Sequence, residues 1–304
     1  MKILIGVDGS HGGFDAARMG ARLAGEQDEV ALYYSPPEMR VRSGSQPEPE
    51  IVARGRQALA DVVFDAAKGH MPEAIRGSVL TIVGTQNPRT GLLAAADDWR
   101  ADLLVVGARG LGTLERLLLG SVSHSVARAA RIPVLVARPG TSRDGKLRVL
   151  LACDGSQADD QLFDVLDQIT WPSETLGRTI TVVESLYAGE VPKWLERKAR
   201  SSDIEAISDA FVREHEAEKL ATHDRMKTVC QRLPKGFYQS DPLVAEGYPA
   251  EQILNTIHAE QIDLVVLGAR SSNAVTRLLL GSTSEKVLSQ AACSVLIVRR
   301  KERP

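Results

Sequence analysis

Three glycines and a serine in this sequence are spaced as a phosphate-binding loop requires. Gly107 and Gly110 follow an apolar run, and after nine further residues Gly120 and Ser121 stand at the start of a helix-like segment. Glycine lets the backbone approach a phosphate without a Cβ in the way. The N–H groups at a helix start, together with the helix dipole, attract an anion. The spacing therefore predicts a phosphate site, and tight turns between strand and helix are the alternative explanation of the glycines.

Two aspartates hold equivalent places in the two halves of the chain. Asp8 and Asp154 each follow the first apolar run of a half, within the tripeptide Asp-Gly-Ser. At the carboxyl end of a strand, a carboxylate can accept hydrogen bonds from ribose hydroxyls or help to hold a metal ion on phosphates. The same tripeptide is typical of an Asx-turn or helix cap. Nucleotide contact is the favoured role, and the capping role stays open.

These candidate residues belong to an internal repeat. The opening ILIGVDGS recurs as VLLACDGS, and the glycine-containing segment and the closing apolar run also recur. The second copy is longer, mostly within 186–225, where charged sequence predicts a solvated amphipathic helix; a partner-binding helix is the alternative. The repeat indicates two copies of one domain. The matching segments are 3–10 with 149–156, 102–121 with 263–282, and 134–138 with 295–299.

The elements that position these residues are short β-branched apolar runs alternating with Ala- and Leu-rich helical segments. Runs without polar alternation are typical of strands buried on both faces of a parallel sheet. Helix starts are expected at Ser10, at Asn87 and at Ser121. The predicted strands lie near 3–7, 30–34, 79–83, 103–107, 134–137, 149–153, 180–184, 243–246, 264–268 and 295–299.

The predicted fold class is therefore α/β, with two tandem doubly wound domains, each a five-stranded parallel sheet flanked by helices. The domains are assigned to 1–140 and 147–304, joined by the Pro- and Gly-containing linker 139–147. The crevice between the first and fourth strands is the expected ligand site. The last strands, 134–137 and 295–298, should pair edge to edge, so that the halves form an intramolecular pseudo-dimer. A further homodimer of whole chains is left open.

Composition narrows the class of partner and the compartment. A net charge of −2 and a pI near 6.3 exclude a globally basic surface, so nucleic acid is not expected as a partner. Cys153, Cys230 and Cys293 lack metal-ligand spacing and are expected to be unpaired thiols of a reducing compartment. The first apolar run is too short for a signal peptide, and no stretch approaches the roughly 20 apolar residues of a membrane span. A cytoplasmic protein with no membrane contact is predicted.

With these marks the sequence resembles the universal stress protein family in its tandem form. The matching marks are the opening IGVDGS, the strand-loop VVGARG, the spacing G-x2-G-x9-G-S and the closing PVLVAR. The resemblance covers essentially the whole chain, once per half. It implies the adenine-nucleotide alpha-hydrolase-like fold and binding of ATP, AMP or ADP, with or without Mg2+, in a stress-response regulatory protein. Which protein partner it would serve is not implied.

The resemblance also implies nucleotide-binding residues at matching positions. In the second half, Ser271 replaces the second glycine of the motif, which places nucleotide binding there in doubt. The residues carried over are Gly6, Val7, Asp8, Ser35, Val106, Gly107, Arg109, Gly110, Gly120, Ser121 and Val122 in the first half, and Asp154, Gly268, Arg270, Gly281 and Ser282 in the second.

Two other classes of function are alternatives to a nucleotide sensor. The segment 11–16 looks like a degraded SGGxDS loop of adenylating enzymes, but a helix start with a permissive Gly-Gly explains it better. A phosphate-binding loop ending in Gly-Lys-Ser/Thr is missing, and so is the Rossmann glycine pattern. His124 near the phosphate helix is more typical of a surface residue than of a catalytic acid. No catalytic residues are assigned, and a protein that senses a nucleotide is favoured over an enzyme that turns it over. An interaction protein with vestigial pockets is the third possible function.

Overall fold

The fold is that of a computed structural model, which describes residues 1–37, 49–110, 119–140, 145–154, 159–183, 202–237, 240–269 and 280–299. Within these ranges, the side chains of residues 49, 202–212 and 214 lie outside the description.

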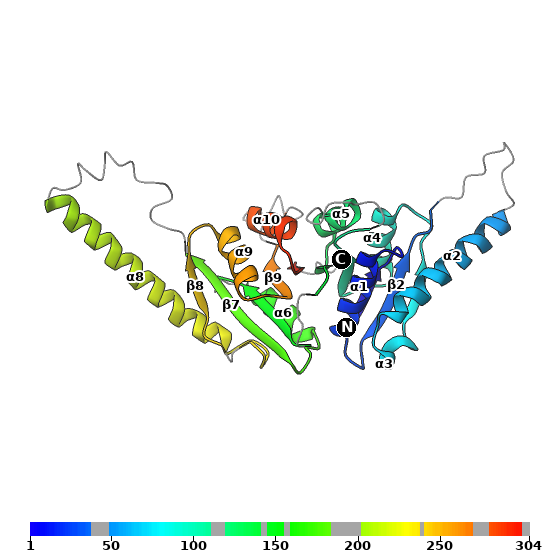
Figure 1. Ribbon diagram of the computed structural model, residues 1–304, viewed down its shortest axis with the longest axis horizontal. Helices are drawn as coiled ribbons and strands as arrows, with labels where there is room; N and C mark the ends of the chain where they lie inside the picture. Colours follow the sequence, from blue (N-terminus) through cyan, green and yellow to red (C-terminus); the bar gives the residue numbers. More distant parts are fainter. Residues whose placement is uncertain are drawn as a thin grey trace.

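A single ten-stranded sheet runs through both halves, in the order β3-β2-β1-β4-β5-β10-β9-β6-β7-β8 (Figure 1). Within each half all paired strands are parallel, and the halves meet where β5 and β10 pair antiparallel. The doubly wound parallel architecture and the pairing of the last strands are thus confirmed. The strands are β1 (Lys2–Gly6), β2 (Glu29–Tyr34), β3 (Leu80–Val83), β4 (Leu103–Gly107), β5 (Val134–Ala137), β6 (Leu147–Ala152), β7 (Thr175–Val183), β8 (Leu243–Glu246), β9 (Leu264–Gly268) and β10 (Ser294–Val298).

Helices cover both faces of the sheet, which explains the continuous apolar runs of the strands. Ile3 and Ile5 of β1 belong to the core under α1, α2, α6 and α8, while Leu4 belongs to the core under α4, α5, α9 and α10. All three side chains are fully buried. The helices are α1 (His11–Arg22), α2 (Pro49–Gly69), α3 (Glu73–Arg76), α4 (Pro88–Asp98), α5 (Ser121–Ala129), α6 (Asp160–Gln168), α8 (Ser202–Cys230), α9 (Pro249–Ala259) and α10 (Ser282–Gln290).

A helix begins at all three expected places, but the expected capping side chain is confirmed at only two of them. Ser10 caps α1 by accepting a hydrogen bond from the Gly13 N–H, and the Asn87 side chain caps α4. At α5 the capping position is Gly120 instead, without a side-chain cap bond, and Ser121 is the first helical residue. A glycine can hold the extended cap conformation, which leaves the first N–H groups of the helix without a side-chain acceptor.

Two buried arginines, Arg138 after β5 and Arg299 after β10, each donate hydrogen bonds to the other half of the chain. The Arg138 guanidinium donates to the carbonyls of Leu288 (2.7 Å) and Cys293 (3.3 Å), near the end of α10. In the reciprocal contact, Arg299 donates to the carbonyl of Ala127 (2.7 Å), in the last turn of α5. A cation at a helix C-terminus is favoured by the unpaired carbonyls and by the helix dipole. Burial lowers the pKa of Arg138 to about 10 and also lowers that of Arg299.

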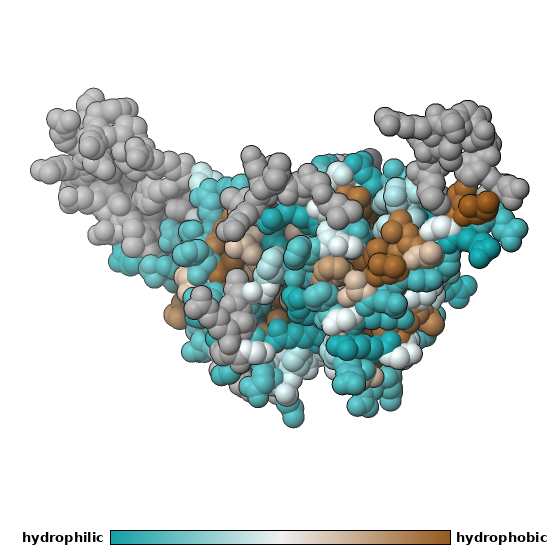
Figure 2. All heavy atoms as spheres, turned by 45° about the vertical axis from the view of Figure 1, so that its right-hand side comes forward, coloured by the Kyte–Doolittle hydropathy of each residue, from teal (hydrophilic) through white to brown (hydrophobic). Residues whose placement is uncertain are grey.

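Two long helices lie toward the outer ends of the sheet, α2 in the first half and α8 in the second (Figure 1). α8 confirms a helix in the expanded segment from Ser202 onward, and residues 186–201 lie outside the described residues. α2 buries Phe64 but exposes Ile51, Leu59 and Val62. In Figure 2, where this side of the molecule comes forward, hydrophobic patches interrupt the polar surface. In the part of the chain that the structure describes, no helix has the length and apolarity of a membrane span.

The three cysteines are free and buried, as expected of unpaired thiols. Burial raises the pKa of the Cys293 thiol to about 12 and also raises the pKa values of Cys153 and Cys230. A thiol whose pKa is higher in the folded than in the unfolded state contributes to the stability of the fold. This contribution is fully present below the pKa of the unfolded state, near 8.5, and is lost as the pH rises toward the pKa of the folded state.

The free energy of unfolding should therefore fall between pH 8 and pH 10.5. The expected contribution of Cys293 to this loss is about 2.5 kcal/mol, because two pH units above the unfolded pKa correspond to about 2.7 kcal/mol. Urea denaturation at both pH values measures the loss, and Cys293→Ala should show a correspondingly smaller one. Equal losses in the two proteins would contradict the assignment to this thiol.

Candidate functional site

The candidate site begins at the crevice beyond the carboxyl ends of β1 and β4. These strands are neighbours, with Gly6 opposite Val106, so the order of strands reverses here as expected. The first turn of α1 packs directly on the β4 loop. A Cβ on Gly12 would overlap the Arg109 carbonyl oxygen, and one on Gly107 would overlap the backbone of Gly12. Gly107 is therefore needed for contact between α1 and β4, and not only for a ligand as predicted.

Asp8 lies just after the end of β1 and is held by its own turn. The Ser10 N–H donates to Asp8 Oδ1 (3.0 Å), and the Ser10 hydroxyl donates to the same oxygen. Asp8 Oδ2 faces Gly110, where an added Cβ would overlap it. The Asx-turn left open by the sequence is thus present at one carboxylate oxygen, while the second oxygen lies against the glycine loop.

The start of α5 is tied to the end of β4. The Gly120 N–H donates to the Ala108 carbonyl (2.7 Å), and the Ser123 hydroxyl donates to the same carbonyl (3.0 Å). Ser121 is exposed and Val122 half-buried at the beginning of the helix. These bonds bring Gly120 beside the Gly107–Gly110 loop, as the spacing predicted. Residues 111–118, between the two motif segments, lie outside the described residues.

Ser123 is a residue that the sequence reasoning missed. It is 3% exposed, and its counterpart Ser284 likewise donates to the Gly268 carbonyl (2.8 Å) in the second half. The signal was available, because both copies have a serine three residues after the glycine that begins the helix. The prediction named Ser121 instead.

Three of the predicted residues lie inside the sheet and not at its mouth. Gly6 faces α4, where an added Cβ would lie 2.9 Å from Leu92 Cδ2. Val106 is buried in the same core. Val7 is buried on the α1 side, and its N–H donates to the Tyr33 carbonyl (2.9 Å). Val7 and Val106 therefore pack in the core, and Gly6 leaves room for Leu92 of α4.

Ser35 borders the crevice at the end of β2. Its side chain is buried, and its hydroxyl donates to the Gln86 carbonyl. The neighbouring Tyr34 has its pKa raised by burial and by the Asp8 carboxylate, while Arg56 acts in the opposite direction. Tyr34, beside Ser35, is therefore within electrostatic reach of both the acidic Asp8 and the basic Arg56.

The second half has the same arrangement of strands and helix starts as the first, but different residues lie beside its aspartate. The Asp154 N–H donates to Asp159 Oδ2 (2.9 Å), and Asp159 stands where the first half has Gly13. Gly281 caps α10, Ser282 is its first residue, and nothing would contact a Cβ on Gly268 within 4 Å. The second half thus has a carboxylate beside Asp154 where the first half has a glycine. Arg270 and Ser271 lie outside the described residues.

Helices α5 and α10 meet across the junction between the halves. His124 of α5 and Glu285 of α10 occupy matching positions of the repeat, and His124 Nε2 lies 2.7 Å from Glu285 Oε1. Arg128 lies 3.9 Å from the same carboxylate oxygen. His124 is therefore part of the contact between halves. Among the described residues, no three His, Cys, Asp or Glu side chains are grouped so that they could hold a metal ion.

Together the fold and the site define a class of protein: a tandem α/β protein with a helix start beyond the first and fourth strands of each half, and with a glycine loop beside it in the first half. The sequence model of the universal stress protein family matches residues 1–138 and again 147–299. The chain belongs to the universal stress protein family, in its tandem form.

Individual relatives agree with this assignment. A universal stress protein from Mycolicibacterium smegmatis is 28% identical over 308 residues, which cover 98% of this chain and 96% of the relative. Universal stress protein Rv1636 from Mycobacterium tuberculosis is 33% identical over 138 residues, or 44% of this chain and 93% of the relative. The crystal structure of a universal stress protein from Archaeoglobus fulgidus superposes with a TM-score of 0.59 at 17% identity, covering 98% of both chains, which shows a shared fold.

Proposed function

We propose that the first half of this protein binds an adenine nucleotide, ATP in particular, and that the protein senses the nucleotide in a stress response instead of consuming it. The observation that carries the proposal is the contact between Asp8 Oδ2 and Gly110, beside the Gly120 start of α5. Through this contact, a carboxylate, a loop of glycine backbone and a helix N-terminus lie close together beyond the ends of β1 and β4. Ribose hydroxyls would bind Asp8, and phosphates would bind the loop and the helix start.

The structure of α1 favours this proposal over an adenylating enzyme. Gly12 of the SGGxDS-like segment leaves room for the Arg109 carbonyl, and an added Cβ on Gly13 would lie 2.9 Å from Asp8 Oδ1. Helix packing thus explains both glycines without a pyrophosphate ligand. Nucleotide extracted from the protein after incubation with ATP, separated by chromatography, tests sensing directly. Intact ATP is expected; conversion to ADP or AMP within minutes would contradict sensing.

The two halves should differ in affinity for ATP. Ser271 replaces a motif glycine, and Asp159 adds a negative charge beside Asp154. A penalty of about 1–2 kcal/mol corresponds to an affinity roughly 5- to 30-fold lower in the second half. Titration calorimetry with ATP, in the presence and absence of Mg2+, should therefore resolve one stronger site.

The matched variant for this titration is Ser271→Gly, which restores the motif. We expect it to strengthen the second site and leave the first unchanged. Two equal sites in the unmodified protein, or no gain from Ser271→Gly, would show that this residue does not set the difference.

A further inference from the structure

Helix α2 has two apolar faces, and only one of them packs on the sheet. Phe64 and Ala67 lie in the core, whereas the side chains of Ile51 and Val62 are 60% and 67% exposed. The outer face of a surface helix is normally polar, so an exposed apolar face indicates contact with another molecule. Because α2 lies toward the outer end of the sheet, this face is open to a second protein (Figure 1).

The exposed apolar residues of α2 form a continuous outer stripe. They recur at intervals of three or four residues, which puts them along one side of the helix over about 22 Å. Arg54, Asp61 and Asp65 are exposed and follow one border of this stripe at the same helical spacing. The outer stripe consists of Ile51, Gly55, Ala58, Leu59, Val62 and Ala66.

The sizes of the side chains along the outer stripe fit a second copy of the same helix in antiparallel orientation. In a two-fold pair, the contact of one residue with another is repeated with the copies exchanged. In one register, every large side chain lies opposite a small residue, so the helices can pack closely. A shift by one turn would instead put Ile51 against Val62 and small residues against each other. The pairs in the matching register are Ile51 with Ala66, Val62 with Gly55 and Leu59 with Ala58.

The same register brings opposite charges together. Asp61 and Asp65 are four residues apart on the exposed border of α2, where like charges repel each other. The two-fold axis puts the charged borders of both copies on the same side of the pair. Arg54 of the second copy then lies level with Val63, midway between the two aspartates. In a parallel pair, Arg54 would face Arg54, so charge and size independently favour the antiparallel arrangement.

The other long helix has a different outer surface. Of the described side chains of α8, only Leu220 is large, apolar and exposed. We propose that α2 pairs antiparallel with α2 of a second copy of this chain, so that two whole chains form a closed two-fold dimer. Contacts between α2 of one chain and α8 of the next would instead build an open filament.

Sedimentation velocity of the full chain measures this association. A single helix pair is at the small end of protein interfaces, so we expect a monomer–dimer equilibrium with a Kd on the order of 10 μM. Val62→Glu puts a charge on the outer stripe and should raise this Kd at least ~30-fold. Leu220→Glu is the matched control, since Leu220 is 63% exposed on α8, and it should leave the Kd unchanged.

Both variants change an exposed side chain, so both should keep the Tm of the unmodified protein within a few degrees. A chain that stays monomeric at about 200 μM would overturn the proposal. So would oligomers that keep growing with concentration, or the same Kd in Val62→Glu as in the unmodified protein.

Cysteine cross-linking tests the register itself. The three natural cysteines are buried, so a cysteine introduced on the outer stripe is an accessible thiol. In the proposed pair, the two copies of position 58 lie beside the two-fold axis, within the roughly 4.4–6.8 Å between Cα atoms that a disulfide spans. The two copies of position 66 are about 22 Å apart along the helices.

With diamide as a mild oxidant, Ala58→Cys should therefore give a disulfide-linked dimer, and Ala66→Cys should remain reduced or cross-link much more slowly. Ala66→Cys is the matched control, because both changes replace an exposed alanine of the same helix. Equal cross-linking of the two variants is the result expected of a parallel pair or of random collisions, and it would refute the antiparallel register.

Discussion

Gly110→Val should abolish ATP binding by the first half while the protein remains folded. An added Cβ overlaps Asp8 Oδ2, and the other oxygen of that carboxylate is held by Ser10. The valine therefore forces Asp8 out of its turn or displaces the glycine loop, and it blocks the approach of a phosphate to the backbone. Gly110 does not have a positive φ, so the effect comes from crowding and not from backbone strain.

Titration calorimetry measures this loss of ATP affinity, and two further variants serve as comparisons. Gly110→Ala introduces the overlapping Cβ alone and should weaken ATP about 10-fold, as expected for one lost contact to a charged group. Gly77→Val is the matched control, since an added Cβ there has nothing within 4 Å. Near-ultraviolet circular dichroism should be the same for all variants. ATP affinity that stays unchanged in a folded Gly110→Val protein would refute the placement of the nucleotide.

Arg138→Met should cause the largest loss of stability predicted for this protein. Methionine keeps the apolar stem of the side chain but leaves the carbonyls of Leu288 and Cys293 without their donor. Buried hydrogen bonds to a charged group contribute about 1.5–3 kcal/mol, so we expect the free energy of unfolding to fall by about 2–4 kcal/mol. Because the contact joins the halves, urea unfolding should also become less cooperative.

The reciprocal and the control variants identify the origin of this effect. Arg299→Met removes the donor to the Ala127 carbonyl and should also destabilise the junction. Arg131→Met changes an exposed arginine that precedes β5 and should alter the stability by less than about 0.5 kcal/mol. If Arg138→Met and Arg131→Met unfold at the same urea concentration, the buried arginines do not hold the halves together.

The repeat and the periodicity of the sequence were sufficient to predict most of the fold. The ten apolar runs correspond to the ten strands, and the last strand of each half was recognised as an edge that needed a partner. Such predictions succeed because burial on both faces of a sheet is recorded in consecutive residues. The error at Ser121 has a local cause, since a glycine and a serine can both precede a helix and only the backbone decides between them.

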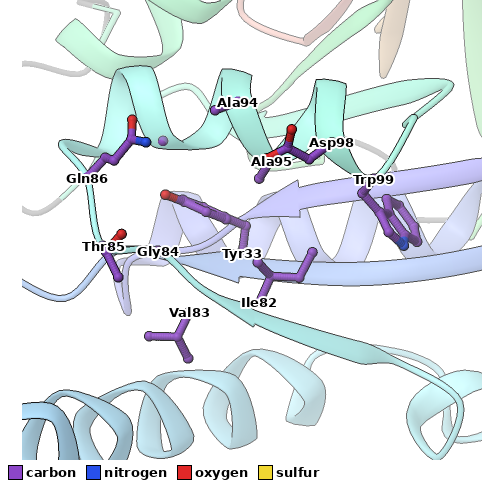
Figure 3. Close-up of a pocket in the computed structure, with 11 residues that line it drawn as sticks. Tyr33, Ile82, Val83, Gly84, Thr85, Gln86, Ala94, Ala95, Asp98 and Trp99 are labelled. Carbon is purple, nitrogen blue, oxygen red and sulfur yellow. The ribbon is translucent and has the colours of Figure 1, made fainter.

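By itself, the sequence determined the family, the α/β architecture, the pairing of the halves and the positions of Asp8, Gly110 and Gly120 at one end of the sheet. Only the tertiary structure decided what those residues contact: Gly107 against Gly12 of α1, and Gly110 against the Asp8 carboxylate. It alone placed Ser123 on the Ala108 carbonyl, buried Arg138 and Arg299 against helix ends, and formed the pocket between β3 and α4 that Tyr33 lines (Figure 3). These contacts join residues from about 15 to 170 positions apart, for example Ser123 with Ala108 and Arg299 with Ala127. Apart from the serine repeated at positions 123 and 284, no local pattern records them, because each contact exists only once the strands are in order and the helices have packed on the sheet.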